Sequence, residues 1–378
     1  MRVKRRTWLI MAVAVVAAAF AVPALAQLGV NAQLSAADDD IPGVVLPASP
    51  VTGDLDGTVA GRDYDDVYAV RLNYNERLSV QMSATAGTDF DLQLWRPGSP
   101  NLLVSNPLSY IVQASSNEGT STEEFWYPAS TTGTYSLDVL DWAGTAKGTY
   151  RLTWDIVKLP EPGIATTMPA TVKWGGGAKI EVLATDDHAV PLPQASIMIA
   201  SRPYGGSAWT YLNMDRDPKS TNYGMPKNKA DALGALTYTV YPTRLTEYRA
   251  IVWPSHDMGK TYGAPTLVSP RATITTPKAP DVVYGKRSFT VSGYLMPKHK
   301  KGATDVKIRF YSKNKDGSWT WRKTVMATNY TSTAHPTYTL YSRKTYLPFK
   351  GSWKILAYIP GDTTHTERTS AARYLTVK

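Results

Sequence analysis

The sequence predicts an all-β fold of three tandem β-sandwiches, one jelly-roll-like and two Ig-like, after a cleaved signal peptide. The convincing periodic segments alternate apolar and polar residues, and no apolar stripe at helical spacing lasts longer than a turn or two. Proline and glycine concentrate at residues 158–163 and 276–280. These two stretches divide the chain into pieces of about 100–125 residues, each long enough to bury its own core.

Residues 1–26 have the three parts of a signal peptide. Basic residues at the start precede an apolar run from Trp8 to Val22, and Ala24 and Ala26 supply a small-residue cleavage pattern. The apolar run is about 15 residues long, short of the roughly 20 that cross a bilayer. We therefore expect a bacterial protein that is secreted or non-covalently attached to the cell surface, with no transmembrane segment after cleavage.

Residues 38–158 are expected to form the jelly-roll-like sandwich. The clearest strand alternates Tyr150, Leu152, Trp154 and Ile156 with polar residues. Such alternation is typical of antiparallel sheets with one buried and one solvated face. Several strands of this kind within about 120 residues indicate a sandwich or a jelly roll.

Residues 164–276 and 279–378 are interpreted as two copies of one Ig-like sandwich. Three aromatic anchors recur in the same order, two of them 110 positions apart and the third 105 apart. The anchor pairs are Trp174 with Tyr284, Trp209 with Trp319, and Tyr248 with Trp353. The shorter spacing places five extra residues in the earlier copy, and we expect them in a long surface loop within residues 213–231.

Three motifs of the first piece resemble, in the same order, the bacterial pre-peptidase C-terminal domain, a relative of the collagen-binding domains of bacterial collagenases. They lie at residues 63–72, 88–95 and 133–139. The last two pieces resemble bacterial Ig-like repeats of exported actinobacterial surface proteins, on residues 289–293, 351–358 and 374–377. The resemblance implies β-sandwich folds and, from the collagen-binding relatives, calcium near the N-terminal linker. Ig-like folds carry many unrelated functions, so function has to be argued from a site.

No catalytic motif occurs, and we expect a protein that is not an enzyme. The chain has no cysteine, no nucleophile elbow, no HExxH pair and no phosphate-binding glycine loop. Pre-peptidase domains often accompany a peptidase, but the two repeats leave no room for one. The histidines are scattered and are interpreted as solvated side chains in turns. They are His188, His256, His299, His335 and His365.

Aspartates concentrate in the first piece and make calcium the one candidate cofactor. Calcium prefers six to eight oxygen ligands, which aspartate-rich loops supply. The candidate ligands are Asp63, Asp65, Asp66 and Asp89, although their spacing matches no EF-hand. The alternative interpretation is a solvated strand face, since Asp91 alternates outward between apolar neighbours.

Three tryptophans of the first piece are candidate binding residues for sugar rings or peptide side chains. Alternation directs Trp95 away from its core, Trp126 has the opposite parity from its aromatic neighbours, and Trp142 lies in a turn. Exposed indole rings offer flat, amphipathic faces to a ligand. The alternative is that these rings pack between domains or under loops.

The net charge of +10 is divided unevenly along the chain. Residues 27–158 contain 7 Lys and Arg against 17 Asp and Glu, whereas residues 279–378 contain 18 against 5. Basic and aromatic residues alternate in the last piece, where Lys307, Arg309, Trp321 and Arg322 are candidate binding residues. Export argues against nucleic acid as a partner and favours an anionic cell-wall polymer or an acidic glycan. The alternative is a domain that is basic without a specific partner.

These patterns predict a non-enzymatic surface or secreted protein that binds an extracellular polymer, which is a glycan, a cell-wall polymer or a matrix protein. In this hypothesis the basic C-terminal piece associates with an anionic cell surface, and the acidic first piece projects outward for adhesion. The alternative function is a structural spacer in a cell-surface assembly.

Overall fold

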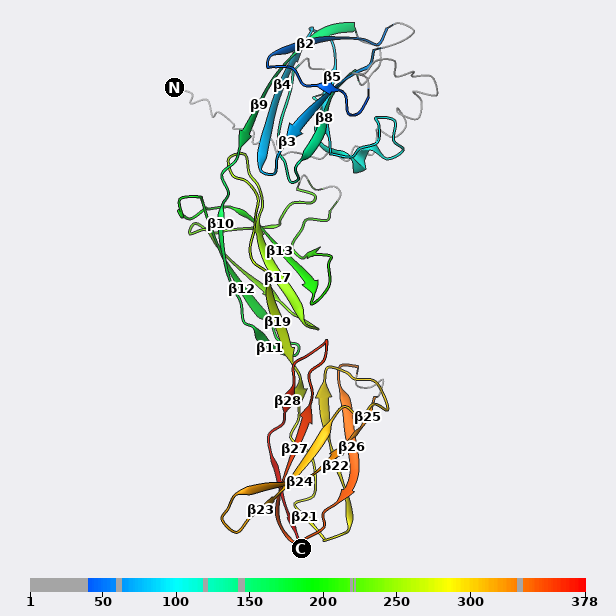
Figure 1. The fold of residues 1–378 in the computed structure, drawn as a ribbon, viewed down its shortest axis with the longest axis vertical. Helices are drawn as coiled ribbons and strands as arrows, with labels where there is room; N and C mark the ends of the chain where they lie inside the picture. Colours follow the sequence, from blue (N-terminus) through cyan, green and yellow to red (C-terminus); the bar gives the residue numbers. More distant parts are fainter. Residues whose placement is uncertain are drawn as a thin grey trace, which may run out of the picture.

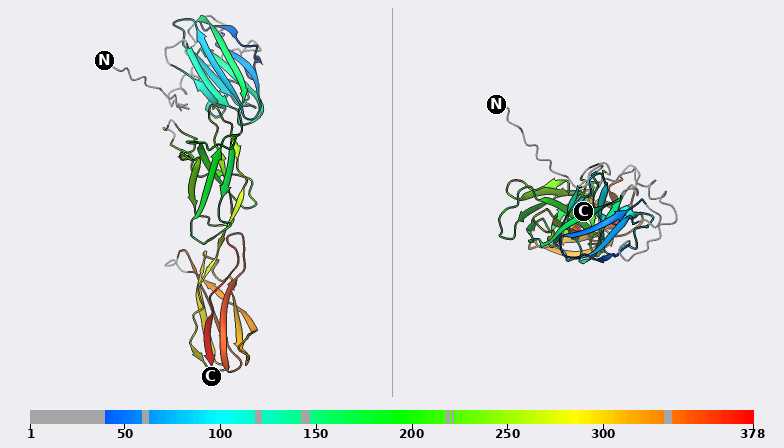
Figure 2. Two further views of the ribbon diagram at one scale, coloured as in Figure 1. Left: turned by 90° about the vertical axis from the view of Figure 1, so that its left-hand side faces the viewer. Right: turned by 90° about the horizontal axis from the view of Figure 1, so that it is seen from above.

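The computed structural model describes residues 40–58, 63–117, 122–141, 147–217, 220, 222–331 and 336–378. These residues form three β-sandwiches joined end to end in an elongated rod (Figures 1 and 2). The prediction of an all-β, tandem-sandwich fold is confirmed. Within the described ranges no helix is long and apolar enough to cross a membrane. The expected signal peptide lies outside the described residues.

The N-terminal domain packs a five-stranded sheet against a four-stranded one. The first sheet contains, in spatial order, β1 (Val44–Val45), β3 (Asp65–Leu72), β8 (Gly133–Asp141), β5 (Phe90–Trp95) and β6 (Ile111–Ser115). The second contains β2 (Val51–Asp56), β9 (Lys147–Lys158), β4 (Glu76–Ala84) and β7 (Thr122–Pro128). Alternate residues such as Leu78, Leu92 and Leu137 are fully buried between the sheets. A short 3-10 helix, η1 (Pro107–Ser109), precedes β6.

The middle domain packs a three-stranded sheet against a larger one. The small sheet contains β10 (Gly163–Thr167), β12 (Ala178–Thr185) and β16 (Ala235–Val240). The large sheet contains β11 (Thr171–Lys173), β19 (Thr266–Arg271), β17 (Thr246–Val252), β13 (Ser196–Pro203) and β14 (Thr210–Tyr211), with β15 (Asn228–Lys229) and β18 (Thr261–Tyr262) paired at its edges. Its core includes Ile180, Ile199 and Ala250.

The C-terminal domain repeats this arrangement. One sheet contains β20 (Thr273–Ile274), β22 (Ser288–Met296), β26 (Thr339–Tyr346) and β25 (Thr328–Tyr330). The other contains β21 (Val282–Val283), β29 (Arg373–Val377), β27 (Gly351–Ile359), β23 (Lys307–Lys313) and β24 (Trp319–Met326), with β28 (Arg368–Thr369) paired to β27. The orders β11-β19-β17-β13-β14 and β21-β29-β27-β23-β24 are equivalent strand by strand.

The boundary between the last two domains lies earlier than the sequence predicts. Strand β20 pairs with β22 of the C-terminal domain, so residues 273–274 belong to that domain and not to the expected unit 164–276. One residue, the buried Ala272, separates β19 from β20. The prolines of segment 276–280 therefore lie within the C-terminal domain, where Lys278 between them pairs with Ser292 of β22. Proline occurs in loops within a domain as well as in linkers.

The N-terminal and middle domains are joined by a buried side-chain clamp. Asn75 is buried with a left-handed φ of 61°, and its Nδ2 donates to the carbonyl oxygen of Lys260 at 3.1 Å. The Asn75 Oδ1 accepts the backbone N–H of Lys260 at 2.8 Å. Beside this pair, the N–H of Gly259 donates to the carbonyl oxygen of Pro160 at 2.8 Å. A Cβ at Gly259 would lie 2.6 Å from the Asn75 Cγ, so the close approach requires glycine.

The middle and C-terminal domains meet through loop 360–367, which follows β27. The backbone N–H of Thr366 donates to the carbonyl oxygen of Pro270 at 2.9 Å. The N–H of Leu245 donates to the carbonyl oxygen of Thr363 at 3.3 Å. Both contacts between the domains use backbone atoms of this one loop.

We expect Asn75→Ala to loosen the first junction. The substitution removes both hydrogen bonds to Lys260 and leaves a buried N–H without its acceptor, which costs about 1–3 kcal/mol. Small-angle X-ray scattering should show a broader distance distribution, and a protease should cleave within residues 159–163 faster. Gln81→Ala, an exposed change in the same domain, should have neither effect. A rod of unchanged shape and protease resistance in Asn75→Ala would contradict this expectation.

Candidate binding surfaces

The outer face of sheet β29-β27-β23-β24 in the C-terminal domain is rich in basic and aromatic side chains. Along β23, Ile308 and Phe310 are buried in the core, so the residues between them point outward. Along β27, Ile355 and Ala357 are buried in the same way. The outward residues are Lys307, Arg309, Tyr311, Lys313, Trp319, Trp321, Lys354, Tyr358 and Tyr374. We call this set the basic–aromatic face.

Cations and rings stack on one another across the strands of this face. The Arg309 guanidinium lies 4.1 Å from the Tyr358 ring centroid. The Lys354 Nζ lies 4.8 Å from the Tyr311 ring and 5.2 Å from the Trp319 ring. Contacts of this kind are worth about 0.5–1 kcal/mol at exposed sites, and they restrict the positions of the charges.

Two rings of the basic–aromatic face are open to solvent. Trp321 is 57% exposed and Tyr374 is 56% exposed. The Trp321 Nε1 donates to the Thr324 Oγ1 at 3.1 Å, which fixes the indole plane on the sheet. The face therefore presents flat rings beside fixed positive charges.

Three of the four residues singled out in this domain lie on the basic–aromatic face, and Arg322 does not. Tyr311 pairs with Trp321 and Phe310 pairs with Lys323, so Arg322 is the extra residue of a β-bulge. Its Nε donates to the Oγ of the buried Ser312 at 2.8 Å. A bulge breaks simple alternation, and this separates Arg322 from the other three residues.

The members of the face that sequence reasoning missed include Tyr311, Lys354, Tyr358 and Tyr374. Each occupies an outward position in a strand whose alternate residues are buried. Strand parity alone would have identified them, once it was known which strands are neighbours.

The equivalent face of the middle domain is covered by side chains of its own domain. Met198, Ala200 and Ile251 are fully buried there. The residues packed over them are Trp209, Tyr211, Met214 and Trp253. Met214 lies in segment 213–231, where the sequence comparison places the five extra residues. The open face of the C-terminal domain lacks this cover.

Trp95 is not available to a ligand, and the expectation of an exposed ring is wrong. The side chain does point away from the main core, but it is only 2% exposed. It packs with Val67 and Leu102 in a separate cluster. The chain after β5 returns over this face of the sheet, and its Leu102 covers the ring. Alternation gives the direction of a side chain and does not reveal such a cover.

Trp126 lies in the junction between the first two domains. Its ring makes an edge-on contact with the His256 ring at 5.5 Å between centroids. The adjacent Arg77 donates to the His256 carbonyl oxygen at 2.7 Å. Trp126 therefore packs between domains, which is the alternative left open by the sequence. Trp142 lies outside the described residues.

Acidic side chains gather at the end of the N-terminal domain that is remote from the other two domains. Strand β3 begins at Asp65 and Asp66 and runs toward Asn75 at the junction, so these aspartates lie at the free tip of the rod. Within the core at this end, the Tyr150 hydroxyl donates to the Asp66 carboxylate and lies 2.5 Å from the Tyr68 hydroxyl.

Some acidic residues at this tip are buried, and among them is Asp91, for which the interpretation as part of a solvated strand face is wrong. Asp91 and Asp138 are almost inaccessible. Burial raises the pKa of Asp91 to about 7, and the negative charges of Glu123, Asp89 and Asp141 reinforce the shift. Burial also raises the pKa of Asp138, with Asp65 as the main charged neighbour.

Calcium binding by the four proposed aspartates stays a prediction. Among the described residues, the groups of three or more His, Asp or Glu side chains with ligand atoms within 4.8 Å of one another do not include them. The four are Asp63, Asp65, Asp66 and Asp89. Asp66 is engaged by the Tyr150 hydroxyl, toward the core.

No protein-family model matches the sequence, and no curated protein matches it. Among solved structures, the pre-peptidase C-terminal domain of a collagenase from Bacillus anthracis is 18% identical and aligns with 28% of this chain and 88% of its own, with a TM-score of 0.23. The D1–D4 ectodomain fragment of ICAM-5 is 10% identical over 82% of this chain and 77% of its own, with a TM-score of 0.29. The FN1–FN3 domains of chicken CNTN1 are 11% identical over 82% and 97%, with a TM-score of 0.22.

The sheets of this chain define it as a tandem β-sandwich protein. Identities and TM-scores as low as those of the solved structures transfer no function, because sandwiches of this kind carry many unrelated sites.

We expect Asp91→Asn to stabilise the N-terminal domain at neutral and alkaline pH. A carboxyl with a pKa of about 7 in the folded state and 3.8 ordinarily binds a proton on folding. Its contribution to stability is complete below pH 4 and is lost as the pH rises through 7. A pKa shift of this size lowers the free energy of unfolding of the wild type at pH 8 by at most about 4 kcal/mol.

Urea unfolding at pH 4 and pH 8, in EDTA, measures this difference. Wild type and Asp91→Asn should be equally stable at pH 4 and differ at pH 8. Asp155→Asn, an exposed aspartate of the same domain, should show no such pH-dependent gain. Equal stability of wild type and Asp91→Asn at pH 8 would contradict the conclusion that burial raises the pKa of Asp91.

Proposed function

We propose that the protein is an exported, non-enzymatic binding protein that attaches to an anionic extracellular polymer through the basic–aromatic face. The observation that carries the proposal is the open, flat array of stacked cations and rings on the C-terminal domain. In this proposal the N-terminal domain is of the pre-peptidase C-terminal kind, and the other two are bacterial Ig-like repeats. The protein is secreted or held non-covalently at the bacterial surface.

The chemistry of the face favours an extended polymer that carries negative charges. Strands in a sheet are about 4.8 Å apart, so side chains of neighbouring strands form a regular two-dimensional grid. Lys307, Arg309 and Lys354 supply positive charge on this grid, and the exposed Trp321 ring supplies an apolar platform. A polymer of acidic sugars or phosphate-linked units offers both kinds of contact along its length.

The opposite charges of the two ends favour an arrangement in which the rod extends away from the polymer surface. The C-terminal domain has a large excess of basic residues, and the N-terminal domain has an excess of acidic ones. An anionic polymer attracts the first and repels the second. The rod would then hold its acidic tip away from the surface, with the middle domain as a spacer (Figure 1). A purely structural spacer, the second candidate, needs no polymer affinity at all.

We expect the double variant Lys307→Gln/Arg309→Gln to bind polygalacturonate about 5–30-fold more weakly at low salt, since each exposed charge contact is worth roughly 0.5–1 kcal/mol. The wild-type affinity should fall steeply as salt rises, and the variant should depend less on salt. Binding to neutral dextran should be weak for both proteins. Co-sedimentation or biolayer interferometry measures all three quantities.

The matched control is Arg343→Gln/Lys344→Gln, which removes the same charge from exposed positions on β26 of the opposite sheet. If binding depends on the face, the control retains most of the wild-type affinity. Equal losses in both double variants would indicate a net-charge effect only. Absence of wild-type binding to polygalacturonate and to a poly(glycerol phosphate) wall polymer would favour the spacer.

We expect Trp321→Ala to weaken polymer binding about 3–10-fold, with little change in Tm, because the ring is mostly exposed and contributes stacking area to the ligand. Trp321→Tyr should retain most of the affinity. Isothermal titration calorimetry and thermal melts separate the two quantities. If Trp321→Ala bound the polymer as tightly as wild type does, the Trp321 ring would have no part in binding.

A further inference from the structure

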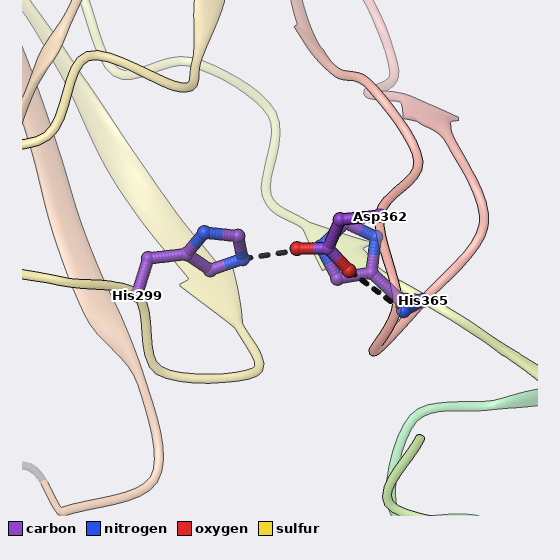
Figure 3. Close-up of side chains that lie close together, drawn as sticks. All are labelled: His299, Asp362 and His365. Carbon is purple, nitrogen blue, oxygen red and sulfur yellow. Dashed lines mark hydrogen bonds and ion pairs between the residues drawn. The ribbon is translucent and has the colours of Figure 1, made fainter. Parts of the chain in front are cut away.

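His299, Asp362 and His365 meet at the end of the C-terminal domain that faces the middle domain. His299 lies in the loop between β22 and β23, and the other two lie in loop 360–367. The two Nε2 atoms are 3.1 Å apart, and the Asp362 Oδ2 lies 3.7 Å from the His365 Nε2 (Figure 3). The expectation that both histidines are solvated is wrong, since His365 is 0% exposed.

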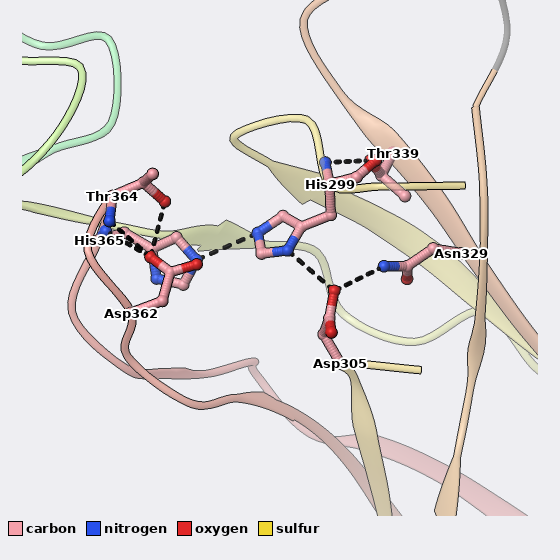
Figure 4. Close-up of polar contacts among 7 residues, drawn as sticks. All are labelled: His299, Asp305, Asn329, Thr339, Asp362, Thr364 and His365. Carbon is pink, nitrogen blue, oxygen red and sulfur yellow. Dashed lines mark hydrogen bonds and ion pairs between the residues drawn. The ribbon is translucent and has the colours of Figure 1, made fainter. Parts of the chain in front are cut away.

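The hydrogen bonds of each ring assign its tautomer. The His365 Nδ1 lies 2.9 Å from the Thr366 carbonyl oxygen, which only accepts, so this Nδ1 carries the proton. The His299 Nδ1 lies 3.0 Å from the Asp305 carboxylate, which also accepts from the Asn329 Nδ2 (Figure 4). In both neutral rings the lone pair is therefore on Nε2.

Two Nε2 lone pairs that face each other at 3.1 Å repel one another unless a proton or a metal ion lies between them. Ligand atoms of a tetrahedral zinc ion lie ~3.3–3.4 Å apart for Zn–N distances of ~2.0–2.1 Å. The three ligand atoms of His299, Asp362 and His365 lie within 4.8 Å of one another, so small side-chain shifts bring them to this spacing. We propose that these three residues bind a divalent transition-metal ion of the zinc class.

The surroundings of the three ligands are those of a metal centre. Asp305 and the Thr366 carbonyl orient the two rings through their Nδ1 atoms, as carboxylates and carbonyls do behind metal-bound imidazoles. The Asp362 Oδ1 accepts two backbone N–H groups, from Thr364 at 2.6 Å and from His365 at 3.0 Å. These bonds leave the Oδ2 directed at the histidines.

The ligand set selects among metals. Two imidazoles and one carboxylate suit zinc and its neighbours, whereas calcium and magnesium prefer oxygen ligands alone. Asp362 is 45% exposed at its side chain and His299 is 10% exposed, so solvent reaches the site from the aspartate side. Three protein ligands leave a fourth position for water.

The place equivalent to His299 in the middle domain is an exposed turn without a buried histidine partner. His188 is the third residue after β12, as His299 is the third after β22. His188 lies with Asp186 and Asp187 in an exposed turn, where the Asp186 Oδ1 caps the backbone N–H of His188. No buried imidazole among the described residues accompanies this turn. His188→Ala is therefore a matched control.

The test is calorimetric titration of the full mature chain, stripped with EDTA and dialysed, with ZnCl2. We expect one strongly bound zinc per chain and no heat from CaCl2. Co²⁺ should bind at the same site and give the visible d–d absorption of a four-coordinate, imidazole-containing centre. The Tm of the C-terminal domain should rise with zinc, since a ligand that binds only the folded state stabilises it.

Asp362→Asn keeps the Oδ1 that caps the loop and removes one ligand charge, so it should bind zinc at least 10-fold more weakly and remain folded. Asp305→Asn should weaken binding about 10-fold through the orientation of His299. His299→Ala should abolish stoichiometric binding, and His188→Ala should bind as wild type does.

Three results would overturn the proposal. One is the absence of zinc binding by the folded wild type. Another is equal zinc affinity in wild type, His299→Ala and Asp362→Asn. The third is a Co²⁺ spectrum of hydrated, six-coordinate ion, which remains decisive if a variant does not fold. Polymer binding by the basic–aromatic face is a separate measurement, and neither outcome depends on the other.

Discussion

Each sheet of this protein has to bury one face, and this requirement determines what the opposite face can carry. In the C-terminal domain, Trp353 and Ile355 of β27 are fully buried beside Phe310 of β23. Since strand residues alternate, the residues between them must point outward. The register then places Tyr311 beside Lys354 across the two strands. The basic–aromatic face is thus organised by the core beneath it, and its charges are held by backbone pairing.

The two domain junctions share a backbone hydrogen bond from equivalent loops, and this repetition accounts for the rod. At the first junction, Gly259 in the loop after β17 donates its N–H to the Pro160 carbonyl oxygen. At the second, Thr366 in the loop after β27 donates to the Pro270 carbonyl oxygen. Strands β17 and β27 occupy equivalent places in their sheets. A duplicated domain therefore reproduces the docking loop and its backbone hydrogen bond to the preceding domain, and the Asn75 side chain adds two further hydrogen bonds at the first junction.

Strand alternation made the fold class and the outward direction of Lys307 and Arg309 predictable from the sequence. Features that depend on long-range contacts were not predictable. Alternation correctly turns Trp95 away from the core, but only the folded chain shows the segment that covers it. His299 and His365 are 66 positions apart, so their meeting depends on which two loops share one end of a sandwich. The bulge at Arg322, which shifts the register by one residue, was not predictable either.

The histidine pair depends on how the docking loop makes its contact with the preceding domain. In the middle domain, the His256 ring itself packs on Trp126, and this contact engages the imidazole face. In the C-terminal domain, Thr366 makes the contact through its backbone N–H, so the His365 side chain turns inward toward His299. The loop after β27 thus makes its contact with the preceding domain through a backbone N–H, and the His365 ring stays available to the site proposed with His299.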